Sequence, residues 1–168
     1  AAVQAARTAP GGIATLILPS DASWNGGGVI GAPLPVPTAP PVDAHAVRQA
    51  ARVLRENKNV LLVLGGAAVH EPSQRLAWRI AAMTGAKLMT EGSNARTERG
   101  RGRLPLERVP YNVDLAAKLL APYDHLIMVN ATPPVSFFAY PGATLSQGRF
   151  TQELDFGAGP PRSFEAGV

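Results

Sequence analysis

The residues best suited to chemistry lie on short loops that follow apolar runs. Gly65, Gly66 and Ala67 come directly after the run Val60 to Leu64 and before a helical pattern. Backbone N–H groups at such a loop can bind a phosphate, because glycine leaves room for a close approach. The loop lacks a full G-x-G-x-x-G pattern, so a plain strand-to-helix turn is the alternative that the incomplete motif favours.

Two later segments supply further candidates for the same edge. Asn94 and Arg96, with Arg99, follow the third apolar run on a long polar loop, and Asn130 with Thr132 ends the fourth. An arginine there can pair with a phosphate or, as we favour, with a carboxylate across a subunit interface. For Asn130 with Thr132, we favour a turn-forming role over ligand binding. The candidate nucleotide crevice therefore comprises Gly65, Gly66, Ala67, Asn94, Arg96 and Asn130.

Several kinds of site are excluded or not expected. The chain has no cysteine, which excludes disulfides, thiolate zinc sites and a Cys nucleophile. The histidines at 45, 70 and 125 are scattered, and only His70, after the glycine loop, merits a test. No G-x-S-x-G nucleophile elbow is present. We predict no catalytic residue and no metal ligand in this chain.

Charge and hydropathy limit the classes of partner that we expect for this chain. The net charge is +4, and five arginines cluster between Arg96 and Arg108, where they could meet phosphate or form a solvated loop. Nucleic-acid binding ranks last, since aromatic-lined basic surfaces and known motifs are missing. No apolar run is long enough to span a membrane and no signal pattern opens the chain, so we expect a cytoplasmic protein. The Ala-rich opening without Met suggests a segment of a longer chain.

Apolar periodicity predicts strands alternating with helices. The pattern predicts a helix over residues 1–6, a buried strand over 13–18, a Pro- and Gly-rich linker, a helix capped by Asp43, a strand over 60–64, a helix from Pro72 to Gly85, a strand over 86–90, a polar loop over 91–110, a helix over 111–120 and a strand over 125–130. This order predicts an α/β fold, a Rossmann-like parallel sheet with helices on both faces.

Several segments, in order, resemble thiamine-diphosphate-dependent enzymes of the acetolactate synthase and benzoylformate decarboxylase type. GGIATLILPSDASW (11–24) resembles the last strand of their pyrimidine-binding domain, and VRQAARVLRENKNVLLVLGGAAV (47–69) the opening of their DHS-like central domain. AAMTGAKLMTEGSNARTERGRG (81–102) and YDHLIMVNATPPVSFFAYPG (123–142) are similar to later parts of it. We therefore expect the end of a pyrimidine-binding domain over 1–24, a linker over 25–42, a central α/β domain over 43–142 and an irregular tail over 143–168 that adds nothing to the sheet.

The resemblance implies a parent enzyme with thiamine diphosphate and magnesium, assembled as a homo-oligomer. The Gly-Asp-Gly segment that holds magnesium in the family is absent, so no ligand of either cofactor is assigned here. Central domains of the family bind FAD in some members, ADP in others and no nucleotide in many. We expect a non-catalytic domain, inactive alone, that serves structure and assembly with other domains or subunits. The alternative is a free-standing module that binds FAD, ADP or NAD.

Overall fold

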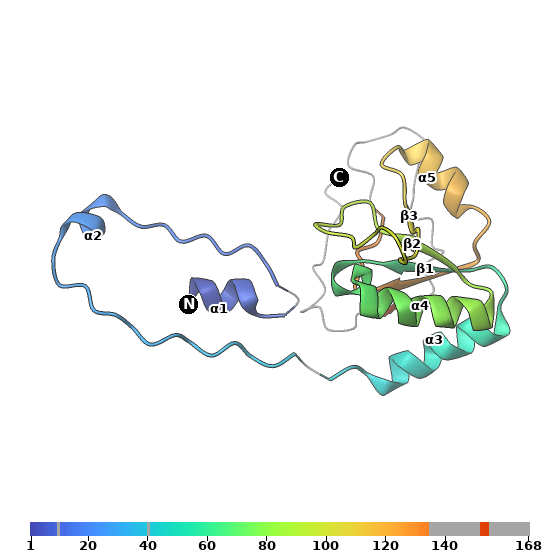
Figure 1. The fold of residues 1–168 in the computed structure, drawn as a ribbon, viewed down its shortest axis with the longest axis horizontal. Coiled ribbons are helices and arrows are strands. Elements are labelled where there is room, and N and C mark those ends of the chain that lie inside the picture. The colour runs from blue at the N-terminus through green and yellow to red at the C-terminus, as the bar shows by residue number, and fades with distance from the viewer. Residues whose placement is uncertain (10, 40, 135–151, 155–168) are drawn as a thin grey trace, which may run out of the picture. The chain divides into compact units, whose positions relative to one another are not determined.

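The computed structural model describes residues 1–9, 11–39, 41–134 and 152–154. These residues group into two compact units, one formed by Ala1–Pro41 and one that begins at Val42. Figure 1 shows the helices of the first unit in blue and the α/β unit in cyan to orange.

The first unit holds two short helices, α1 (Ala2–Arg7) and α2 (Ser20–Trp24). Residues 25–39 form neither helix nor strand, as expected for a segment whose prolines fix φ and remove backbone donors. A 2.6 Å hydrogen bond from Gln4 Nε2 in α1 to the backbone oxygen of Pro35 joins α1 to the segment that follows α2.

The prediction of a buried strand over residues 13–18 is wrong. The segment is irregular, and Ile13 is fully exposed, with Leu16, Ile17 and Leu18 also largely in solvent. A strand needs a neighbour to bond its N–H and C=O groups, and no described residue of this unit offers one. The helix α2 was not anticipated either.

The second unit alternates helices and strands. Its elements are α3 (Ala44–Glu56), β1 (Val60–Leu64), the 3₁₀ helix η1 (Gly66–Val69), α4 (Glu71–Thr84), β2 (Lys87–Thr90), β3 (Glu107–Arg108), α5 (Val113–Leu120), β4 (His125–Val129) and β5 (Gln152–Leu154). The Asp43 side chain accepts from the backbone N of His45 and caps α3, as predicted. Gly85 ends α4 with φ of 77°, a left-handed conformation that glycine adopts without strain.

The sheet has the strand order β3-β2-β1-β4-β5, and each neighbouring pair is parallel. In the central pairing, Leu62 lies beside Leu88 of β2 on one side and Ile127 of β4 on the other. All five residues of β1 are buried, which is why the sequence there is a continuous apolar run. The predicted α/β fold with a parallel sheet is confirmed.

Helices cover both faces of the sheet. On one face, Leu61, Val63 and Met128 pack with Ala116 and Leu120 of α5. On the other face, strand residues of opposite parity pack against α3, through Ala50 and Leu54, and against α4, through Ala77. The alternating burial follows from the two-residue period of a strand.

Two sequence predictions about the ends of the sheet are corrected. The polar loop predicted over residues 91–110 contains a two-residue strand, β3, which pairs with β2. The prediction that the tail adds nothing to the sheet is wrong for Gln152–Leu154, because β5 pairs in parallel with β4. The pairing gives the free edge of β4 a partner for its backbone groups. The remaining tail positions, 143–151 and 155–168, lie outside the described residues.

Among the helices that the structure describes, none is long and apolar enough to cross a membrane.

Candidate functional site

The carboxyl ends of β1 and β4 form the point where the chain reverses its direction across the sheet. From β1 the chain moves outward through β2 to β3, then returns to the other side of β1 as β4. In open α/β sheets, the crevice at such a reversal is the usual ligand position. The candidate residues Gly65, Gly66, Ala67 and Asn130 lie together at this edge, because Gly65 follows β1 and Asn130 follows β4.

The Asn130 side chain closes the loop after β1. Its Oδ1 accepts a hydrogen bond of 2.8 Å from the backbone N of Ala67 in the first turn of η1. This N–H is one of the donors that a phosphate at this position would need. Asn130 itself has φ of 51°, a left-handed conformation that asparagine tolerates better than most residues. The side chain of Asn130 thus takes the place at this N–H that a ligand oxygen would otherwise occupy.

The two glycines are required by close packing against that side chain and its neighbours. A Cβ on Gly65 would lie 2.5 Å from the backbone oxygen of Asn130 and 2.5 Å from Glu91 Oε1. A Cβ on Gly66, which has φ of 45°, would collide with Asn130 Oδ1. The absence of a Cβ at both positions therefore leaves room for Asn130 and Glu91 of the same chain.

Glu91 is the polar residue of this edge that the sequence analysis missed. It follows β2, and its Oε2 accepts hydrogen bonds of 2.8 Å from both the backbone N and the hydroxyl of Thr132. Its own backbone N donates to the oxygen of Leu64 at 3.0 Å. Glu91 therefore joins the ends of β2, β1 and β4. Its position directly after a strand was the available signal.

Asn94 and Arg96 are placed differently from the other candidates. Asn94 Nδ2 donates to the backbone oxygen of Glu91 at 3.0 Å, so Asn94 holds its own loop, while its Oδ1 is buried without a partner in the part of the chain described. Arg96 is exposed, and the described contacts include no hydrogen bond or ion pair from its side chain. A small cavity of about 110 Å³ lies beside Glu91 and Thr132, with Val63 and Tyr111 among its lining residues.

The long loop after β2 is fastened to the start of α4. Glu98 Oε2 accepts from the backbone N of Glu71 at 2.8 Å, and the buried Gln74 donates from Nε2 to the backbone oxygens of Val69 and Glu98. Glu71 forms ion pairs with Arg75 at 2.8 Å and with Arg103 at 3.1 Å. These contacts make the loop part of the packed unit.

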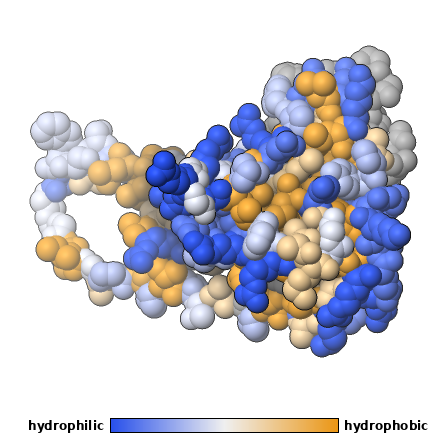
Figure 2. All heavy atoms as spheres, turned by 45° about the vertical axis from the view of Figure 1, so that its right-hand side comes forward, coloured by the Kyte–Doolittle hydropathy of each residue, from blue (hydrophilic) through white to orange (hydrophobic). Residues whose placement is uncertain are grey.

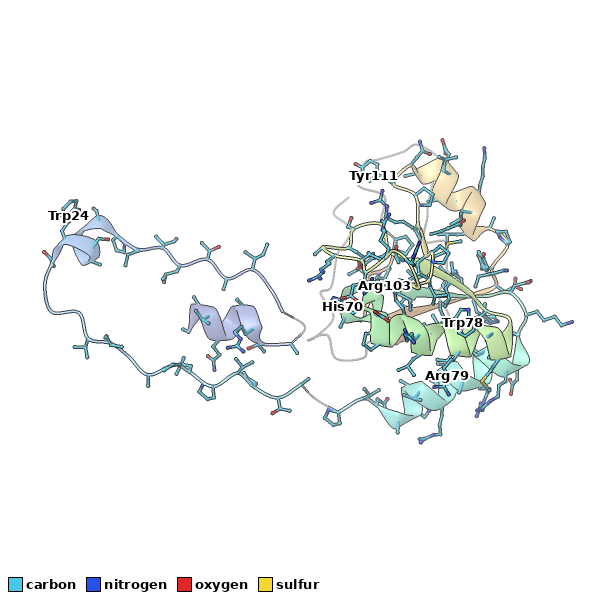
Figure 3. All side chains as sticks on the ribbon, viewed as in Figure 1. Trp24, His70, Trp78, Arg79, Arg103 and Tyr111 are labelled. Atoms are coloured by element: carbon cyan, nitrogen blue, oxygen red, sulfur yellow. The ribbon has the colours of Figure 1, made fainter. Side chains whose placement is uncertain are left out.

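The structure changes the titration of the Glu71 carboxylate. Hydrogen bonding from Arg75, followed by the positive charge of Arg103, lowers the pKa of Glu71 below its ordinary value. Figure 3 shows Arg103 and His70 near the beginning of α4. Through its ion pair with Arg103, the Glu71 carboxylate also ties the loop after β2 to the start of α4.

The histidines do not converge. His70 is exposed and precedes α4 without capping it through its side chain, and His125 Nε2 lies 3.0 Å from Asn57 Oδ1. Within the described ranges, no group of three or more His, Cys, Asp or Glu side chains could hold a metal ion.

Comparison with known proteins shows that this chain is similar in sequence to a curated protein. It is 41% identical over 131 residues to a Mycobacterium tuberculosis protein named "Putative acetolactate synthase large subunit IlvX". The match covers 77% of this chain but 25% of the relative, so the chain spans about a quarter of the relative's length. No family model matches, and no solved structure matches. The resemblance drawn from the sequence is confirmed by this relative.

Proposed function

We propose that this chain is a non-catalytic central domain preceded by an arm, by which we mean the first unit, Ala1–Pro41. The premise is that the chain corresponds to a quarter of an acetolactate-synthase-like polypeptide. Its role is structural support and subunit assembly in a thiamine-diphosphate-dependent enzyme. The observation that carries the proposal is the hydrogen bond from Ala67 N to Asn130 Oδ1. At the edge where an α/β sheet usually binds its ligand, Asn130 is bonded to Ala67 and Glu91 is bonded to Thr132.

The arm supports a role in assembly. Ile13, Ile17, Trp24 and Ile30 are each more than four-fifths exposed in the first unit. Exposed apolar surface costs about 25 cal/mol per Å² relative to its burial, and contiguous apolar segments commonly mark interaction sites. We propose that other domains of the parent enzyme, in a homo-oligomer, cover these residues.

The parent enzyme would use thiamine diphosphate and magnesium to cleave or join carbon–carbon bonds next to a carbonyl. The described residues of this chain do not fit these groups. Magnesium prefers carboxylate and phosphate oxygens, yet the described residues include no group of three or more His, Asp or Glu that could hold a metal ion, and Glu91 Oε2 already accepts two hydrogen bonds from Thr132. We assign no reaction step to this chain.

A nucleotide-binding module for FAD, ADP or NAD is the second candidate function. Its support is the position of Gly65, Gly66 and Ala67 at the chain reversal. Against it, a phosphate would have to displace Asn130 from Ala67, and Arg96 makes no described contact with this edge. Thermal unfolding with and without each nucleotide separates the two proposals, since only a nucleotide-binding module would be stabilised by its ligand.

A chimera tests the structural role directly. The matched quarter of the M. tuberculosis relative is replaced by residues of this chain, and the molar mass of the product is compared with that of the unaltered relative. We expect the same assembled mass, and we expect the isolated chain to form no acetolactate from pyruvate with thiamine diphosphate and Mg²⁺ added. A chimera that fails to assemble, or product from the isolated chain, would contradict the proposal.

A further inference from the structure

An apolar groove runs between α3 and α4 on one face of the sheet. Its volume is about 550 Å³, and it is open to solvent along one side. The sheet residues Leu62, Leu64, Ile127 and Val129 contribute to its lining, below walls formed by the two helices. The groove lies wholly within the α/β unit.

Several apolar side chains on the walls of the groove are exposed to solvent. On α4, Leu76, Ile80 and Met83 line the groove and are 57%, 40% and 86% exposed. Their spacing places them on one stripe of the helix. On α3, Val47 lines the opposite wall and is 42% exposed. In the view of Figure 2, hydrophobic side chains of the α/β unit lie exposed between strongly hydrophilic ones.

The rim of the groove is positively charged. Arg55 lines the groove itself, and helical spacing puts Arg48 and Arg52 on the adjoining side of α3. Arg79 comes from α4 (Figure 3), next to the stripe of Leu76 and Met83. Within the described residues, none of these four arginines takes part in an ion pair.

The two helices that form the walls of the groove carry few carboxylates among their described residues. The helix α3 contains one acidic residue, Glu56, at its last position. The helix α4 contains one, Glu71, which is already paired with Arg75 and Arg103. The unpaired cations therefore define the charge that an occupant should carry.

We propose that this groove binds an amphipathic α-helix of another polypeptide, with aspartates or glutamates beside its apolar stripe. The exposed apolar side chains on the two helical walls match the way grooves accept a helix, through residues spaced three and four apart. The cationic rim adds attraction and sets the orientation of an acidic partner. This proposal goes beyond the structural role of the domain, because it names the chemistry of a partner.

Two other occupants fit the observations less well. A second copy of this chain carries a net charge of +4 and would bring further cations to the rim. A small apolar ligand would leave the arginines unpaired, and ligand pockets normally enclose most of their ligand, whereas this groove is open along one side.

The test is binding of a fluorescent helical peptide of about 18 residues, whose leucines recur at i, i+3, i+4 and i+7 and are flanked by glutamates. Fluorescence anisotropy with the full chain measures its dissociation constant, beside that of a peptide with lysine at each glutamate position. We expect measurable binding of the acidic peptide, weakened by salt, and at least about tenfold weaker binding of the basic one.

Substitutions locate the site. Leu76→Glu and Met83→Glu should each weaken binding about tenfold or more, while Leu115→Glu should leave it unchanged. Leu115 is the matched control, since it is 57% exposed like Leu76 but lies on α5, which packs on the opposite face of the sheet. Arg48→Glu combined with Arg52→Glu should transfer the preference to the basic peptide. Because Met83 is 86% exposed, its variant should fold even where Leu76→Glu does not.

Three outcomes would overturn the proposal. The first is absence of binding by the acidic peptide, and the second is equal loss of binding in Leu115→Glu. The third is self-association of the unaltered chain that Met83→Glu abolishes, measured by sedimentation, which would assign the groove to a second copy.

Discussion

Asn130 Oδ1 and the backbone N of Ala67 are 2.8 Å apart, although 63 residues separate them in the sequence. The bond joins the loop after β1 to the loop after β4, across the reversal point of the sheet. It uses a donor at the beginning of η1 that a bound anion would otherwise satisfy. The donor is therefore occupied by a side chain whose backbone is itself in the left-handed region.

Two substitutions of Asn130 should separate the contribution of its hydrogen bond from the cost of its left-handed backbone conformation. Asn130→Ala loses the hydrogen bond, worth about 1 kcal/mol, and keeps a left-handed φ that costs roughly another 1 kcal/mol for alanine. Asn130→Gly loses the bond without the backbone strain, so it should be the less destabilising by about 1 kcal/mol. Urea unfolding measures both values. An alanine variant as stable as the glycine variant would contradict the assigned strain.

Gly65 should not tolerate a methyl group. Gly65→Ala places a Cβ 2.5 Å from Asn130 O and Glu91 Oε1, so both loops must shift. We expect a loss of about 1–3 kcal/mol in unfolding free energy, typical of overpacking. Gly92→Ala is the matched control, because its Cβ would lie 3.5 Å from the nearest atom, Val109 O, and should change stability by no more than about 0.5 kcal/mol. Equal effects of the two changes would refute the packing argument.

Local sequence signals predicted the elements of the α/β unit well where they were strong. Continuous apolar runs gave β1 and β4, and the helix signals Asp43 and Gly85 gave the boundaries of α3 and α4. The same reasoning failed for residues 13–18, because an apolar run becomes a strand only when a neighbouring strand bonds its backbone. It failed for β5 for the opposite reason, since its polar sequence is paired through backbone bonds to β4.

The candidate site was predictable in position but not in detail. Topology alone brings Gly65 and Asn130 to one edge, and the sequence predicted that convergence. It could not predict that Asn130 would bond to Ala67, since the contact depends on the register of β4 beside β1. Glu91 was missed because a single carboxylate after a strand has no motif. Its partner, Thr132, lies 41 residues away.

Glu91 should matter to stability through Thr132. Glu91→Ala removes the acceptor of both hydrogen bonds from Thr132, and we expect a loss of about 2–3 kcal/mol, since bonds to a charged group are stronger than neutral ones. Glu91→Gln keeps one oxygen that can face Thr132, so it should lose about half as much. Combining Glu91→Ala with Thr132→Ala in a double-mutant cycle measures the coupling. Additive effects of the two changes would show that the hydrogen bond from the Thr132 hydroxyl contributes nothing, because Thr132→Ala keeps the backbone N–H.

The ion pairs of Glu71 should make stability depend on pH in acid. Its pKa is lower in the folded chain than in the unfolded one, so its contribution is complete above the ordinary glutamate pKa of about 4.3 and is lost as the pH falls through the lower folded value. Glu71→Gln should therefore be less stable than the unaltered chain at pH 6, and the difference should shrink as the pH falls from about 5 to 3. Urea midpoints at a series of pH values measure this convergence. Glu107→Gln, at an exposed carboxylate without an ion pair among the described residues, is the control. A constant difference between Glu71→Gln and the unaltered chain across this range would assign the effect of Glu71 to packing instead of charge.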